Sequence, residues 1–294
     1  MRELTGQHKG PLVLLHGGAG PQDPRSGGAG EAAKELAAIA QEAAARLATE
    51  SGQELVRFCI KAMEDAERFN AGRGSALQAD GLARQTAAFM AGGSQTFSGV
   101  IGATYVDNPI DLAIYGQGQA SRVVAPPGTE LLARQAGTPI RMNLTPRRLE
   151  RFVERVQRSE TQWDTVGCVL RCAKGELWAG TSTGGRGFEF PGRVSDSGTV
   201  AGNYASRYAA VSATGIGEEI VDDALAARFE TRIRDGMALV ATNQKCLSEA
   251  ESAGRRYGWI AVDGNEGWAL AHTTPNMPAV VWGPGGAVWV SSSS

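Results

Sequence analysis

The fold is decided by the run Trp163-Asp164-Thr165-Val166-Gly167-Cys168-Val169-Leu170, followed after a short turn by Gly175-Glu176-Leu177-Trp178-Ala179-Gly180-Thr181-Ser182-Thr183-Gly184-Gly185. Two short apolar runs around the turn Ala173-Lys174-Gly175 predict a β-hairpin. The first strand begins on a hydroxyl residue that follows an acid, and the second ends in a cluster of hydroxyls and glycines. Hydroxyl side chains are therefore expected together where these two adjacent strands begin and end.

A charge pair follows this hairpin directly. The segment Pro191-Gly192-Arg193-Val194-Ser195-Asp196-Ser197 places an arginine and an aspartate three residues apart. Hydroxyls at strand ends, glycines that allow close backbone approach and a fixed charge pair together form a candidate site. These features alone name no reaction.

Composition limits the class of protein. The chain has 294 residues, of which 42% are hydrophobic and 20% charged, and this is typical of a globular protein with a sizeable core. Its formal net charge of −2 gives no electrostatic reason to expect a nucleic-acid partner. No run approaches the ~18 apolar residues of a membrane helix, and residues 1–10 do not resemble a signal peptide. We expect a single-domain cytoplasmic enzyme with no nucleic-acid or membrane partner.

The four cysteines do not indicate a metal site or a disulfide scaffold, because their spacing fits neither. Cys168 and Cys172 would share one face of a strand and are interpreted as small, reduced core residues.

Hydrophobic periodicity predicts helices at 31–49, 53–67, 218–232 and 236–252, with inward-facing positions that include Leu36, Leu55, Ala224 and Phe229. Strands are predicted at 11–15, 83–90, 100–106, 208–213, 258–262, 268–272, 279–282 and 287–290. Residues 125–162 are predicted to be a variable linker, in which 146–159 forms a polar, arginine-rich surface helix.

Several of these motifs, in this order, resemble the plant-type asparaginase and isoaspartyl peptidase family of N-terminal-nucleophile hydrolases, which includes glycosylasparaginase. Thr165 matches the threonine that becomes the first residue of a β chain after the precursor cleaves itself. Thr183 matches the second family threonine, and Arg193 and Asp196 match the pair that holds substrate. The strand ending His-Gly-Gly-Ala-Gly at residues 16–20 is also typical of the family.

The resemblance implies a fold and a chemistry. The fold would be α+β, a four-layer αββα sandwich, with the chain cut between Asp164 and Thr165 into residues 1–164 and 165–294. Thr165 would attack the side-chain amide of L-asparagine or a β-aspartyl dipeptide, with its own α-amine as base. An α-amine has a reference pKa near 7.7–8.0, so this scheme needs none of the three histidines. Thr183 would orient Thr165.

Further roles follow from the same resemblance. Thr214 and Gly215 would bind the reacting amide and form the oxyanion hole, and Asn70 would support the site. No cofactor is expected, except that the Phe-Asn-Ala-Gly-x-Gly loop implies a structural sodium ion near Glu64, Phe69 and Ala71. A dimer of cleaved αβ units is also implied.

The sequence leaves three alternatives open. Asp164 is the residue found before the nucleophile in glycosylasparaginases, so a glycosylasparaginase-like hydrolase is one. The family usually carries acidic residues near Thr86 and Ala91, which leaves an unprocessed, inactive homologue with a binding or structural role as another. The third is an esterase, because Gly180-Thr181-Ser182-Thr183-Gly184 fits the nucleophile elbow G-x-S-x-G.

Overall fold

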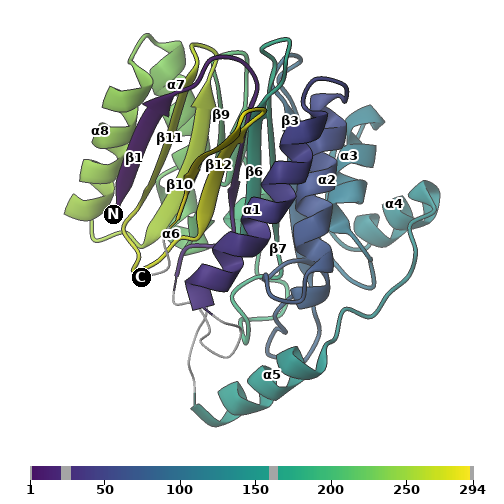
Figure 1. Ribbon diagram of the computed structural model, residues 1–294. Helices are drawn as coiled ribbons and strands as arrows, with labels where there is room; N and C mark the ends of the chain where they lie inside the picture. Colours follow the sequence, from purple (N-terminus) through teal and green to yellow (C-terminus); the bar gives the residue numbers. More distant parts are fainter. Residues whose placement is uncertain (1, 21–27, 159–164, 292–294) are drawn as a thin grey trace.

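The computed structural model describes residues 2–20, 28–158 and 165–291, and the chain within these ranges forms two antiparallel-rich β-sheets flanked by helices (Figure 1). The helices are α1 (Gly28–Arg46), α2 (Gly52–Asp65), α3 (Pro109–Tyr115), α4 (Gly128–Ala136), α5 (Pro146–Arg158), α6 (Gly217–Asp222), α7 (Leu225–Arg234) and α8 (Leu239–Ser252).

The smaller sheet has the strand order β1-β11-β10-β9-β8 and is antiparallel throughout. Its strands are β1 (Glu3–Gln7), β8 (Asn203–Ala205), β9 (Ala209–Gly215), β10 (Tyr257–Asp263) and β11 (Gly267–His272). All residues of β9, β10 and β11 are buried, which fits central strands covered on both faces.

The larger sheet has the order β13-β12-β2-β6-β7-β3-β4-β5, with one parallel pair, β4 and β5. Its strands are β2 (Leu12–His16), β3 (Gln85–Ala91), β4 (Thr96–Ala103), β5 (Val123–Val124), β6 (Val166–Arg171), β7 (Leu177–Thr183), β12 (Ala279–Gly283) and β13 (Gly286–Val290). The predicted hairpin is thus at its centre, as β6 and β7.

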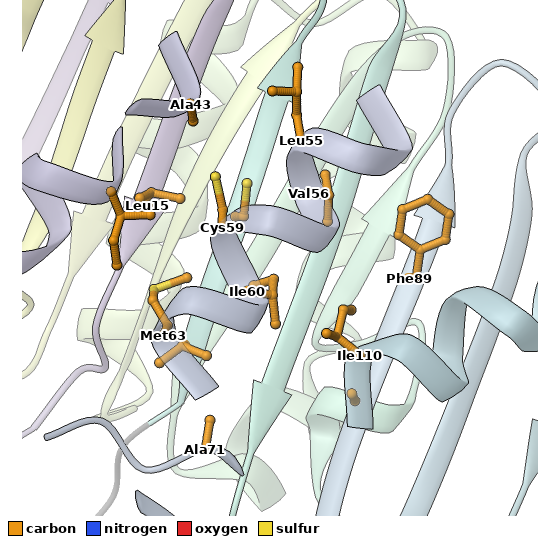
Figure 2. Close-up of a cluster of buried hydrophobic side chains, with 14 of the residues drawn as sticks. Leu15, Ala43, Leu55, Val56, Cys59, Ile60, Met63, Ala71, Phe89 and Ile110 are labelled. Atoms are coloured by element: carbon orange, nitrogen blue, oxygen red, sulfur yellow. The ribbon is translucent and has the colours of Figure 1, made fainter. Parts of the chain in front are cut away.

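Three hydrophobic clusters hold these elements together. One lies between the larger sheet and the helices α1, α2 and α3; Figure 2 shows part of it, with Leu55, Cys59 and Ile60 of α2 facing the strands. A second joins the facing sides of the two sheets, and it includes Val169 from one sheet and Ile260 from the other. The third lies between the smaller sheet and the helices α7 and α8.

Most predicted elements are confirmed, with ends shifted by a few residues. The buried face of α1 includes Leu36, as expected, and that of α2 includes Leu55. All four cysteines are buried and free, and Cys168 and Cys172 belong to the same cluster, as interpreted from sequence.

The linker prediction was wrong in part. Residues 125–162 contain α4 as well as α5, and α5 is not a simple solvated helix. Arg148 and Arg151 of α5 are buried, whereas Leu149 and Val153 are about half exposed. The helix therefore turns Arg148 and Arg151 toward the protein. The sequence also gave no prediction of β1 and α3.

The predicted helix at 218–232 is in fact two helices, α6 and α7, and Ala224 between them is exposed rather than inward-facing. Ala224 has φ 46° and ψ 42°, the left-handed conformation, which breaks the helical run. An L-residue with a Cβ adopts this conformation at a cost of about 1–2 kcal/mol.

No helix within residues 2–20, 28–158 and 165–291 has the length and apolar character needed to cross a membrane.

Replacing Ala224 by glycine is expected to raise the free energy of unfolding by about 1 kcal/mol, because glycine relieves the left-handed strain and is the better residue at the start of α7. Urea denaturation measures this change. The control is Ala38→Gly in the middle of α1, where the same substitution at an exposed helical position should lower stability by about 1 kcal/mol. A loss of stability at both positions would contradict the strained conformation of Ala224.

Candidate functional site

Thr165 and Thr183 meet where β6 begins and β7 ends. Val166 pairs with Ser182 in the antiparallel register, so the residues before and after them are neighbours. The Thr165 hydroxyl donates to Thr183 Oγ1 over 3.3 Å, and the N–H of Gly185 donates to the same oxygen over 3.1 Å. Both threonines are buried. The expected cluster of hydroxyls is therefore present.

Thr214 and Gly215 end the strand β9 in the other sheet. Thr214 Oγ1 accepts a hydrogen bond from the N–H of Ala19, in the glycine-rich turn after β2, over 3.0 Å. Gly215 has φ 134°, and a Cβ there would lie 2.5 Å from Tyr257 Cα, so only glycine fits. The two residues thus lie at the junction of β9 with that turn.

Arg193 is held by two carboxylates. Its Nε and Nη2 donate to the two oxygens of Glu218 over 2.7 and 2.9 Å, and its Nη1 donates to Glu189 over 3.1 Å. Three of its five N–H groups are engaged in this way. The other two, one on each terminal nitrogen, are not engaged by the described residues.

Asp196 opens a short 3₁₀ helix, Asp196–Gly198, and is almost fully buried. Its Oδ1 accepts from the Ser195 hydroxyl over 3.0 Å, while Oδ2 has no partner among the described residues. Burial raises the pKa of Asp196 to about 6, although the Ser195 hydrogen bond and the charge of Arg193 both act to lower it.

Gly217 brings the charge pair together. A Cβ at this position would lie 2.7 Å from Arg193 Nη2 and 2.7 Å from Asp196 Oδ1. Any side chain would therefore separate the two charged groups or displace the start of α6. The sequence-predicted pair Arg193 and Asp196 is thus brought to one place in the structure.

Asn70 fixes the loop that follows Thr183. Its Nδ2 donates to the carbonyl of Gly185 over 2.5 Å, and its own carbonyl accepts from the N–H of Gly184 over 2.8 Å. These bonds connect Asn70 to the loop after Thr183, and its predicted supporting role stays a prediction.

Sequence reasoning missed two residues of this region. Glu189 binds Arg193 and also accepts from the N–H of Arg186 over 2.7 Å, which links the charge pair to the loop after Thr183. His16 is buried and contacts the carbonyl of Thr165 over 3.1 Å. The sequence marks His16 only as the end of a strand, so its partner was not predictable. Asp164, the predicted residue before the cleaved bond, lies outside the described residues.

The comparisons with known proteins decide the family. The model of a family described as asparaginase matches residues 9–288. The chain belongs to the asparaginase family. It is 40% identical to the isoaspartyl peptidase/L-asparaginase of Nostoc sp., over 90% of this chain and 89% of that protein. It is 37% identical to the protein of the same name from Synechocystis sp., over 92% of this chain and 87% of the relative. A plant-type L-asparaginase from Pyrococcus horikoshii is 32% identical, over 87% of this chain and 92% of the relative.

The esterase alternative requires Ser182 as its nucleophile, and the position of Ser182 does not suit that role. Ser182 is fully buried on the face of β7 that meets α2, and its hydroxyl donates to the Glu64 carboxyl over 2.7 Å. Its neighbours Thr181 and Thr183 point to the opposite face, as alternation along a strand requires. No histidine contacts Ser182 in the described hydrogen bonds, and the esterase alternative has no support.

Two residues of the loop predicted to bind sodium, Glu64 and Phe69, have other partners in the structure. The side chain of Glu64 accepts from Ser182 and from the N–H of Ile110, so it faces α3 and β7. The carbonyl of Phe69 accepts from the Arg148 guanidinium over 3.2 Å. The positive charge of this guanidinium would oppose the binding of a sodium ion at the same oxygen. Within the described ranges, no group of three or more His, Cys, Asp or Glu side chains is placed to hold a metal ion. The sodium ion stays a prediction.

Glu64 is expected to make stability depend on pH. Burial raises the pKa of Glu64 to about 8, although the hydrogen bond from Ser182 lowers it, so the neutral acid is the folded form at neutral pH. A carboxyl whose pKa is raised by folding stabilises the protein at low pH, and this contribution is lost as the pH rises toward 8. The free energy of unfolding of the wild type, relative to Glu64→Gln, should therefore fall between pH 5 and pH 8 by at most about 1.4 kcal/mol per pH unit.

Urea denaturation at several pH values measures this difference. Glu42→Gln, at an exposed position of α1, is the control and should differ little from the wild type. A constant difference between the wild type and Glu64→Gln over this range would show that Glu64 is ionised in the fold.

Proposed function

We propose that this chain is a self-processing N-terminal threonine amidohydrolase that hydrolyses L-asparagine, β-aspartyl (isoaspartyl) dipeptides or both, through a β-aspartyl-enzyme intermediate. The observation that carries the proposal is the contact between the Thr165 and Thr183 hydroxyls at the start of β6. Two of the relatives above, from Nostoc sp. and Synechocystis sp., are named isoaspartyl peptidase/L-asparaginase, which supports the substrate class.

The architecture proposed with this function is the four-layer αββα sandwich of the N-terminal-nucleophile hydrolases. The three clusters described above support it, since they alternate with helices, sheet, sheet and helices. The chain is one domain that cleaves itself between Asp164 and Thr165, so that residues 165–294 begin with the nucleophile.

Cleavage would start with attack of Thr165 Oγ on the carbonyl of Asp164, an N-to-O acyl shift. The α-amine that is released then lies on the same residue as the hydroxyl and accepts its proton when Thr165 attacks substrate. Thr183 Oγ1 already accepts a hydrogen bond from the Thr165 hydroxyl and so holds the attacking oxygen in place.

The charge pair would hold the amino-acid part of the substrate. The remaining N–H groups of Arg193 bind the α-carboxylate, and Asp196 Oδ2, which has no described partner, binds the α-ammonium. The side-chain amide of the substrate is then directed to Thr165, and its product ammonia or amine leaves when the β-aspartyl ester forms. Water hydrolyses this ester.

Thr214 and Gly215 would stabilise the oxyanion. Because Thr214 Oγ1 accepts from the N–H of Ala19, its own proton is directed elsewhere and is suited to donate to a developing negative charge. The loss of one such donor typically costs about 10²–10³ in rate.

Two further expectations belong to this proposal. The enzyme is cytoplasmic, and its working form is a dimer of cleaved αβ units. Asp164 favours a glycosylasparaginase-like activity as the second candidate, which an assay with a sugar-linked asparagine tests. The residues at the positions that suggested an inactive homologue make ordinary contacts: Thr86 Oγ1 accepts from the N–H of Gly102 over 3.2 Å, and Ala91 packs in the core.

Thr165→Ala is expected to abolish both self-cleavage and hydrolysis of asparagine, because the nucleophile of both steps is removed. Mass spectrometry should find a fragment starting at Thr165 in the wild type and an intact chain near 30.8 kDa in the variant. Ser182→Ala should still cleave and hydrolyse. Hydrolysis retained in Thr165→Ala, or wild-type chain that stays intact while active, would refute the proposal.

Asp196 is expected to add a second step, near pH 6, to the acid limb of kcat/KM, below the step set by the α-amine of Thr165. Its pKa of about 6 means that the carboxylate needed for the substrate ammonium is lost as the pH falls below about 6, so kcat/KM should fall there. Asp196→Asn should lower kcat/KM by about 10- to 100-fold at pH 7.5, mainly through KM, because one charged hydrogen bond is lost. The step near pH 6 should also disappear, while the step set by the α-amine of Thr165 remains.

The control is Asp235→Asn, which changes an exposed aspartate and should leave the profile unchanged. An acid limb that persists near pH 6 in Asp196→Asn would assign it to another group.

A further inference from the structure

The imidazole of His16 is fully buried between the two sheets and has a polar partner on each nitrogen. Nδ1 lies 3.1 Å from the carbonyl oxygen of Thr165, and Nε2 lies 3.1 Å from the hydroxyl oxygen of Ser212 on β9. A carbonyl can only accept, so Nδ1 carries the proton and donates to Thr165. Nε2 of the neutral ring then accepts, and the Ser212 hydroxyl donates to it.

Because Ser212 donates to His16, the directions of the neighbouring hydrogen bonds are also determined. Ser212 Oγ lies 2.7 Å from Thr181 Oγ1, and Thr181 Oγ1 lies 2.9 Å from the side-chain amide of Asn203. Because the single proton of Ser212 is used on His16, Thr181 must donate to Ser212. Thr181 then accepts from Asn203, which presents Nδ2 to it. This requires the Asn203 amide to be turned so that Nδ2 faces Thr181, since the amide oxygen and nitrogen are assigned from the hydrogen-bond network.

Gly167 leaves the space for this chain. A Cβ at Gly167 would lie 2.1 Å from Ser212 Oγ and 2.2 Å from His16 Nε2, inside the hydrogen bond itself. Gly167 is also the register partner of His16 in the pairing of β2 with β6. The glycine two residues after the nucleophile is therefore explained by the bond that passes over it.

We propose that His16 is a positioning residue: through the donor chain Asn203–Thr181–Ser212–His16 it anchors the carbonyl of Thr165 and so orients the nucleophile. The inference rests on the proposed function. Once the bond before Thr165 is cut, that residue has no covalent attachment on its amino side. The hydrogen bond from His16 to its carbonyl then restrains the residue that must present amine and hydroxyl together.

The role is not proton transfer. Burial lowers the pKa of His16 to about 3, so the ring stays neutral over the range in which the amine of Thr165 titrates. Its single N–H proton is donated to a carbonyl oxygen, which is too weakly basic to take it. His16 is therefore expected to affect the rate by geometry alone.

A matched pair of substitutions tests this. The amide nitrogen of asparagine takes the place of histidine Nδ1, whereas that of glutamine takes the place of Nε2. His16→Asn keeps a donor for the Thr165 carbonyl, and His16→Gln does not. We expect kcat for asparagine to fall less than about 10-fold in His16→Asn and on the order of 10²-fold in His16→Gln, with KM changed little in both.

Precursor cleavage, followed by mass spectrometry, gives a second readout with the same expected ranking, so a variant that does not mature is still informative. The shape of the pH profile should stay that of the wild type in His16→Asn. His8→Asn is the control for a histidine outside the chain of donors and should behave as the wild type. Thermal unfolding of each variant separates loss of fold from loss of orientation.

The inference would be overturned if the two His16 variants had similar thermal stability and lost kcat equally, or if His16→Gln kept more activity than His16→Asn. The loss of a limb of the pH profile in His16→Asn would also overturn it. Thr165→Ala is measured in parallel. If it stays active, the proposed function fails and this role fails with it; if it is inactive while the two His16 variants rank equally, only the positioning role is wrong.

Discussion

The hydrogen bond between Thr165 and Thr183 depends on the register of β6 against β7. Val166 is paired with Ser182, and this places the two threonines as the next neighbours at the end of the hairpin. Since side chains alternate along a strand, a slip of one residue would turn Thr183 toward α2 and bring Ser182 to the site. The apolar residues of both strands oppose such a slip, because it would reverse every side chain between two packed layers.

Close packing at two glycines makes the polar contacts of the site possible. Gly167 leaves room for the bond from Ser212 to His16, and Gly217 leaves room between the two charged side chains that follow the hairpin. Each glycine lies far in the sequence from the side chains for which it leaves room, so the local sequence does not reveal why a glycine is needed there. At these two positions the fold needs the absence of a side chain, and no reactive group is required there.

The sequence predicted what local pattern controls. Most strands of the two sheets and the helices α1, α2 and α8 follow from apolar periodicity, and the threonines and the charge pair follow from family motifs; the short strands β5 and β8 were not predicted. It did not predict β1, whose polar run Glu3–Gln7 is held by pairing with β11. Nor did it predict the break at Ala224, because a left-handed alanine leaves no local signal. The partners of His16 and Arg193 are long-range contacts, which need the assembled sheets.

The charges around Arg193 determine what the site can bind. Glu189, Glu218 and Asp196 lie around Arg193, and Arg186 also pairs with Glu218 over 3.3 Å, so three acidic groups face two guanidinium groups. A carboxylate alone would bind Arg193 against the field of three acidic groups. A ligand that carries an ammonium beside its carboxylate offsets that field and satisfies Asp196 Oδ2 as well. Under the proposed function, these acidic groups would select an intact α-amino acid end over a simple acid, which is the chemistry expected of an enzyme for asparagine and β-aspartyl compounds.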